Sequence, residues 1–105
     1  MIKGLSQKEV DFILATLHQH VPNARILAFG SRVSGTPKKY SDLDICLDNG
    51  APLELSKWAL LDEAFEESDL PFKIDVSDYH RISEDFRKIV EQTSVDIGRK
   101  IPWQK

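Results

Sequence analysis

Two aspartates one residue apart are the first feature of this sequence that could do chemistry. Asp42 and Asp44 lie in the segment SDLDICLD, where polar and apolar residues alternate. Alternate side chains of a strand share a face, so the two carboxylates would lie side by side, with Leu43 pointing into a core. Neighbouring carboxylates repel each other unless a divalent cation, an Arg or Lys pair, or water compensates them. Mg²⁺ is one such cation, because it prefers oxygen ligands and is often held by one or two carboxylates together with substrate phosphates.

A glycine-serine turn precedes this pair. Gly30 and Ser31 follow the apolar run ARILAF, and Gly35 would end a short helix that begins at Ser31. Backbone N–H groups at such a turn, together with the start of a helix, form a binding site for anions. A phosphate cradle beside paired aspartates is what nucleotide chemistry requires. Arg32 would either reach a phosphate or pair with a carboxylate, and both alternatives stay open.

A third carboxylate can join the pair from a later strand. In the segment FKIDVS, residues 72–77, apolar and polar residues alternate, which places Asp75 on the polar face. If this strand lies beside the one that carries Asp42 and Asp44, the three carboxylates converge. Asp78 is close by in sequence, but its place at the strand end favours a turn or helix-entry role. We therefore expect Asp75 to be the third member.

The pattern G-S-x-x-x-G followed by S-D-x-D resembles the nucleotidyltransferase superfamily that includes DNA polymerase β. The residues that fill the pattern are Gly30, Ser31, Gly35, Ser41, Asp42 and Asp44. The short chain resembles the minimal nucleotidyltransferase (MNT) branch, the partner of HEPN proteins in two-gene toxin–antitoxin modules. One departure weakens the expected grip on a triphosphate: Val33 and Ser34 stand where the family usually has a small residue followed by a basic one.

The resemblance implies a set of roles for the carboxylates. Asp42 and Asp44 would hold two Mg²⁺ ions, with Mn²⁺ as the alternative metal. Asp75 would complete the ion that activates an attacking hydroxyl, and would accept the hydroxyl's proton or pass it to solvent. All three residues are thus predicted to be both catalytic and metal-binding.

The resemblance also implies how ATP, or another nucleoside triphosphate, would be bound. Gly30 and Ser31 would contact the β- and γ-phosphates, and Gly35 would let the loop pass close to them. Ser41 would orient Asp42 or cap the loop. Together with Arg32, these residues form the predicted nucleotide-binding group.

For the acceptor, the resemblance implies a tyrosine hydroxyl of a HEPN toxin, which would receive AMP and lose its activity, making this chain an antitoxin. The chain has no room for an acceptor-binding domain, so a hetero-oligomer is expected. One alternative is a non-catalytic nucleotide-binding antitoxin that masks its partner by contact. A second is a small-molecule nucleotidyltransferase completed by a partner chain. A purely structural alternative for the motif is a polar hairpin edge, whose aspartates, Asp42 and Asp44, keep the sheet soluble.

Periodicity supplies the elements that must position these residues. It predicts helices at residues 6–20, 31–34, 53–68 and 82–94 and strands at 24–29, 42–48 and 72–77. Ser6 and Glu9 have capping-box spacing at the start of the first helix. The expected fold is an α/β (α+β) domain of the polymerase β-like type. It has a small mixed sheet of about three strands, helices packed on one face and the metal site on the other.

Length and composition set the remaining bounds. The 105 residues predict a single domain, 1–105, and the net charge of −3 argues against direct DNA binding. Cys46 is the one cysteine, so no internal disulfide can form, and we expect a buried or half-buried thiol. The absence of an apolar targeting segment or membrane-length run predicts a cytoplasmic protein without membrane contact. The tail from Asp96 to Lys105, with Trp103, is expected to dock on the domain, although it could also contact a partner.

Overall fold

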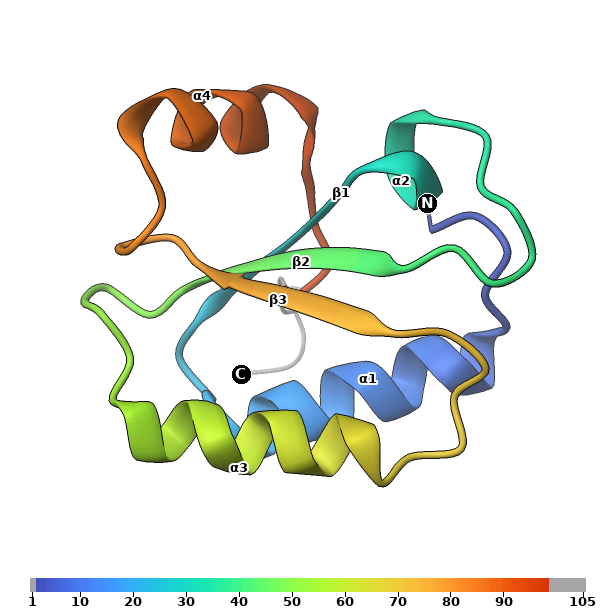
Figure 1. Cartoon of the computed structure of the whole chain (residues 1–105), viewed down its shortest axis with the longest axis horizontal. Coiled ribbons are helices and arrows are strands. Elements are labelled where there is room, and N and C mark those ends of the chain that lie inside the picture. The colour runs from blue at the N-terminus through green and yellow to red at the C-terminus, as the bar shows by residue number, and fades with distance from the viewer. Residues whose placement is uncertain (1, 99–105) are drawn as a thin grey trace, which may run out of the picture.

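A mixed four-stranded sheet forms the centre of the computed structural model, which describes residues 2–98 (Figure 1). Its strands are β1 (Arg25–Phe29), β2 (Leu43–Asp48), β3 (Ile74–Asp78) and β4 (Val95–Asp96). They lie in the order β3-β2-β1-β4. β1 is antiparallel to both β2 and β4, whereas β2 and β3 are parallel. The predicted mixed sheet is confirmed, and β4 is an addition to it that the sequence did not indicate.

The helices cover both faces of this sheet. α1 (Gln7–His20) and α3 (Leu55–Glu66) lie together on one face, and α4 (Glu84–Thr93) lies on the other, as Figure 1 shows. The expectation that helices pack on one face therefore holds for α1 and α3 but not for α4. The physical reason is a second apolar cluster, in which Leu27 of β1 and Cys46 of β2 contact Val90 of α4. These side chains point away from the main core and need their own cover.

The main core lies between the sheet and the pair α1 and α3. Its fully buried members come from alternate positions of β1 and β2 and from the inner faces of the two helices. They include Ile13, Leu17, Ile26, Ala28, Leu43, Ile45, Leu47 and Leu61. This alternation leaves Asp44, Cys46 and Asp48 on the α4 face of β2, so Asp44 lies opposite the core-facing Leu43, as the sequence predicted.

Local signals fix the helix starts. The predicted capping box is present, because the Ser6 hydroxyl accepts from the Glu9 N–H while the Glu9 carboxylate accepts from the Ser6 N–H. Ser83 caps α4 with its hydroxyl, which accepts from the Phe86 N–H.

Among residues 2–98, no helix is long and apolar enough to cross a membrane. The predicted docking of Trp103 concerns a residue outside the described range.

Candidate active site

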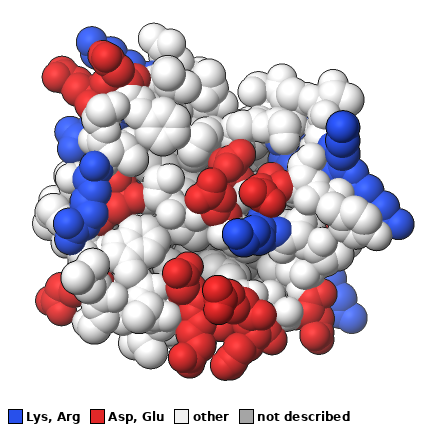
Figure 2. All heavy atoms as spheres, viewed as in Figure 1, with Lys and Arg blue, Asp and Glu red and all other residues white. Residues whose placement is uncertain are grey.

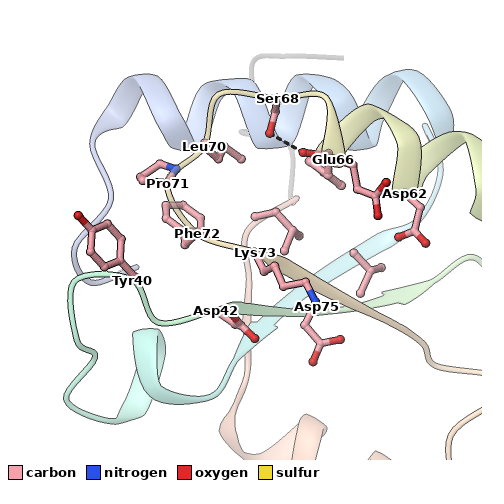
Figure 3. Close-up of a pocket in the computed structure, with 13 residues that line it drawn as sticks. Tyr40, Asp42, Asp62, Glu66, Ser68, Leu70, Pro71, Phe72, Lys73 and Asp75 are labelled. Carbon is pink, nitrogen blue, oxygen red and sulfur yellow. Dashed lines mark hydrogen bonds between the residues drawn. The ribbon is translucent and has the colours of Figure 1, made fainter.

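The parallel pairing of β2 and β3 decides where the three predicted carboxylates lie. In this register Asp44 is directly opposite Asp75, and paired residues share a face of the sheet. That face is opposite the one on which Leu43 and Ile45 enter the main core. Figure 3 shows the side chains of Asp42 and Asp75 both pointing away from α1 and α3. Three acids from two separate segments therefore meet at one end of the sheet.

The proximity of the three carboxylates affects the pKa of Asp44. Burial raises the pKa of Asp44 above its ordinary value, and the negative charges of Asp75 and Asp42 raise it further. Asp42 and Asp75 are exposed to solvent, whereas Asp44 is half-buried between them and the turn at Gly30. Within residues 2–98, no three His, Cys, Asp or Glu side chains are yet gathered closely enough to form a preassembled metal cluster.

The donor set at this corner matches the preference of a hard cation. The potential ligands are the carboxylate oxygens of Asp42, Asp44 and Asp75. The half-buried Asp44 carboxylate has the other two as negative neighbours and no cationic partner among the groups that shift its pKa. Such a set fits Mg²⁺ or Mn²⁺ better than Zn²⁺, which favours nitrogen and sulfur ligands. A divalent ion bound between Asp42, Asp44 and Asp75 would remove the repulsion that raises the pKa of Asp44.

Gly30 brings the turn after β1 against this carboxylate. Its φ of 80° lies in the region that side-chain-bearing residues rarely adopt. A Cβ at this position would press on the Asp44 carboxylate. Only glycine can therefore make the turn here and lie in contact with Asp44, which couples the predicted phosphate turn to the predicted metal site.

The short helix α2 (Ser31–Ser34) begins at this turn, as predicted. The N–H groups of Val33 and Ser34 both donate to the Gly30 carbonyl, and Gly35 donates to the Ser31 carbonyl. Across residues 2–98, the N–H groups of Ser31 and Arg32 make no hydrogen bond, and the Ser31 side chain is exposed. Two donors and a hydroxyl at the turn are therefore free to bind an anion.

Arg32 was expected either to reach a phosphate or to pair with a carboxylate, and its side chain instead binds backbone carbonyls. Its side chain is 1% exposed and donates to the carbonyl oxygens of Ser41, Lys3 and Lys39 at 2.8, 2.9 and 3.2 Å. The guanidinium also lies over the Phe72 ring, 4.6 Å from its centroid. With its donors used in this way, Arg32 holds the loop before β2 from inside. It contacts no carboxylate in the described part of the chain, and its position does not favour a phosphate contact.

Ser41 and Gly35 serve the same loop. The Ser41 hydroxyl accepts from the Lys38 N–H at 2.8 Å, so of its two predicted roles the structure shows the loop cap. A Cβ on Gly35 would lie 3.0 Å from the Ser31 Cα, which explains the glycine by close local packing. The predicted contacts of Gly30, Ser31 and Gly35 with a triphosphate stay predictions.

The other acids of the two strands are structural. Asp78 is buried and accepts from the Leu53 N–H at 2.8 Å, so it has a structural role, and Asp75 stays the predicted third carboxylate. Asp48 pairs with Arg25 at 2.9 Å and with His80 at 2.7 Å. The Cys46 thiol is buried, and burial, followed by the charges of Asp48 and Asp78, raises its pKa to about 11. The expectation of an unreactive buried thiol is therefore supported.

A pocket of about 850 Å³ adjoins the carboxylates, and no pattern in the sequence indicated it. Its lining comes from the loop before β2, the end of α3 and the segment that leads into β3, as Figure 3 shows. The polar and aromatic residues that line it include Tyr40, Asp42, Asp62, Glu66, Ser68, Phe72, Lys73 and Asp75. These segments are far apart in sequence, so only folding brings them together.

Comparison with known proteins agrees with this geometry. Residues 6–99 match the sequence profile of the family described as "Nucleotidyltransferase domain". The chain is 43% identical over 96 residues to a Haemophilus influenzae Rd protein named "Probable protein adenylyltransferase MntA", covering 91% of this chain and 84% of that protein. A solved structure described as "Crystal structure of the toxin-antitoxin with AMP-PNP" contains a chain of the same fold, with a TM-score of 0.67 and 23% identity. The match covers 84% of this chain and 71% of that one.

The family match spans the whole of the predicted site, from the turn at Gly30 to Asp75. The 43% identical relative covers nearly the same length, since its match extends over 96 residues. The chain therefore belongs to the nucleotidyltransferase domain family, to which its glycine-serine turn and paired aspartates had pointed.

Proposed function

We propose that this protein is a metal-dependent adenylyltransferase that moves AMP from ATP onto a hydroxyl of a partner protein. The observation that carries the proposal is the register that sets Asp75 opposite Asp44, with Gly30 in contact with the Asp44 carboxylate. The name of the Haemophilus influenzae relative, a probable protein adenylyltransferase, supports the choice of nucleotide and acceptor.

The reaction is an in-line displacement at the α-phosphorus. The acceptor oxygen forms a bond to that phosphorus while the bond to the bridging oxygen of the β-phosphate breaks, and pyrophosphate leaves with the electron pair. Asp75 is exposed at the sheet edge, so it can accept the hydroxyl proton or pass it to water. Mg²⁺ held by Asp42, Asp44 and Asp75 would supply charge stabilisation for the attacking and leaving oxygens.

The triphosphate is assigned to the turn between β1 and α2. The N–H groups of Ser31 and Arg32 and the exposed Ser31 hydroxyl point to an anion-binding role, because they have no partner within residues 2–98. Gly30 brings these donors next to Asp44, so phosphate and metal would share one corner. Arg32 contributes through its side chain only by holding the loop.

The partner we propose is a HEPN-type toxin whose tyrosine receives AMP, which makes this chain a cytoplasmic antitoxin within a hetero-oligomer. The structural relative is part of a toxin–antitoxin assembly determined with AMP-PNP, which supports both a partner and a nucleotide. The exposed position of Asp75 at the sheet edge supports access by a protein side chain.

Label transfer tests the function. The purified protein is incubated with α-labelled ATP, Mg²⁺ and the product of the neighbouring gene, and label on that product is measured. Asp44→Asn should abolish labelling, because it removes a charged member of the site. Asp85→Asn is the matched control, since Asp85 is an exposed carboxylate on α4, and it should leave labelling unchanged. Absence of label with the wild-type protein, while Mg²⁺-ATP still raises its melting temperature, would favour masking by contact.

A further inference from the structure

Strand β3 is an edge of the sheet, and its outer side carries unused backbone groups. The Leu43 N–H donates to the Lys73 carbonyl and the Tyr79 N–H donates to the Leu47 carbonyl, so alternate residues of this segment bond to β2. The residues between them, Ile74 and Val76, direct their N–H and C=O groups outward. Throughout residues 2–98, no backbone hydrogen bond reaches these outward groups. Such an edge is a template for another strand.

The pocket beside the carboxylates lies along this edge. Ile74, Asp75 and Val76 all line it, and Asp62 and Glu66 of α3 form its opposite side. Figure 3 shows Asp75 directed away from α3, toward the catalytic face, while the side chains of Asp62 and Glu66 lie on the α3 side of the strand. Along the β3 edge, the pocket therefore combines free backbone hydrogen-bonding groups, apolar side chains and carboxylates.

We propose that an extended segment of the acceptor protein adds to β3 as a further strand and so delivers its hydroxyl to Asp75. This inference rests on the proposed function and names how the acceptor is recognised. Strand addition of this kind obtains affinity from main-chain hydrogen bonds and specificity from pockets for alternate side chains. The register then fixes which side chain reaches the reacting corner.

The alternation of a strand gives the acceptor segment a specific pattern. The residue opposite Asp75 shares its face, and an added strand lies about 4.8 Å away, so a tyrosine at this position lies beside the carboxylates. The residues before and after that tyrosine point to the other face, toward Asp62 and Glu66. Lys or Arg at those two positions would be favoured, because their long side chains can reach the carboxylates of Asp62 and Glu66 across the pocket.

The charge distribution agrees with a basic segment. Figure 2 shows carboxylates gathered over α3 and a second group near the centre of the same face. Asp62, Glu66, Asp42 and Asp75 are all exposed acids that line the pocket, and Lys73 is the one cation among its lining residues. Opposite charges favour encounter and suppress acidic competitors. An extended Lys-Tyr-Lys or Arg-Tyr-Arg segment is thus the proposed occupant.

Synthetic peptides test this directly, without requiring transfer. The probe is a short peptide with a central tyrosine flanked by lysines, and its binding to the full chain is measured by fluorescence anisotropy. A counterpart with glutamates in place of the lysines should bind at least about tenfold more weakly. Methylating alternate backbone amides of the lysine peptide should abolish binding for one set of amides and spare the other, because a strand pairs through one edge only.

Variants of α3 locate the binding site. Glu66→Lys should weaken the lysine peptide about tenfold and strengthen the glutamate peptide, whereas Glu63→Lys, an exposed acid outside the pocket, should change neither. Both variants should keep the stabilisation by Mg²⁺-ATP. Binding in this pattern without label transfer would refute the proposed function but retain the docking site. Equal binding of the two peptides, equal effects of the two methylated sets, or a dimer of this chain that competes for the edge would overturn the inference.

Discussion

Removing the buried guanidinium of Arg32 should destabilise the protein and loosen the loop that carries Asp42. In Arg32→Met the apolar stem is retained, but the carbonyl oxygens of Ser41, Lys3 and Lys39 lose their donor. Hydrogen bonds that involve a charged group contribute about 1.5–3 kcal/mol each. The contact with Phe72 adds about 2 kcal/mol, because the pair is buried. These gains are gross values: water can replace much of the bonding to the three carbonyls, and the variant no longer bears the cost of burying a guanidinium. We therefore expect a net loss of about 2–4 kcal/mol in the free energy of unfolding.

The measurement is denaturant unfolding followed by circular dichroism, together with a thermal melt. For a domain of this length, 1 kcal/mol corresponds to about 4–8 °C, so the middle of the expected range lowers Tm by roughly 12–24 °C. Lys57→Met, at an exposed position of α3, is the control and should change the stability by less than about 0.5 kcal/mol. Arg32→Lys should recover only part of the lost stability, because a single ammonium group cannot reach all three carbonyls that the planar guanidinium binds.

The same variants separate a structural role from a phosphate contact. Affinity for Mg²⁺-ATP is measured well below the melting temperature of each variant. If Arg32 acts from within the loop, Arg32→Lys should bind Mg²⁺-ATP within a few-fold of the wild type. A loss of more than about tenfold in affinity with unchanged unfolding free energy would refute this account and restore the phosphate contact.

Three further predictions follow from the site and the sheet. Asp44→Asn should abolish transfer while leaving Tm equal or slightly higher without metal, because it removes a charge that burial and, after it, the charges of Asp75 and Asp42 disfavour, as the raised pKa of that carboxyl shows; a lower Tm by calorimetry would instead make Asp44 structural. Gly30→Ala should lower Tm and abolish transfer, whereas Gly50→Ala, which shares the positive φ but has open space around it, should cost about 1 kcal/mol and leave transfer intact. Burial raises the pKa of Asp48, but hydrogen bonds from the Gly50 N–H, Arg25 and His80 outweigh the effect of burial, so the pKa of Asp48 is lowered. The resulting stability is present above about pH 4 and is lost as the pH falls further, so acid titration of Arg25→Met should show a weaker loss in that range; an unchanged acid transition would contradict this.

Much of the fold could be predicted from local pattern. The period of two placed Leu43 and Ile45 in the core and Asp44 on the opposite face, because a strand alternates whatever it packs against. The capping box at Ser6 and the glycine at position 30 were equally local, since a hydroxyl cap and a positive φ need only neighbouring residues. The apolar run of β1 is likewise local, and its residues are buried in both apolar clusters, one on each face of the sheet.

Other features depended on contacts between distant segments. β4 has two residues, too few for any periodicity to be visible, and it exists because Val95 and Asp96 reach β1. The position of α4 on the second face follows from its packing on Leu27 and Cys46, which its own amphipathic pattern does not specify. Arg32 is a further case, since a charged residue in a short polar helix gives no sign that three carbonyls will surround it.

The residues that we expect to carry the chemistry could be named from the sequence alone, because their types and spacing are local properties that an alternating strand and a tight turn preserve. Three features became visible only in the folded chain: Asp75 lies opposite Asp44, the β3 edge adjoins a pocket, and Asp62 and Glu66 border that pocket. The register between two parallel strands and the packing of a helix beside them are set by the connecting segments and the shared core, and no local pattern records either one.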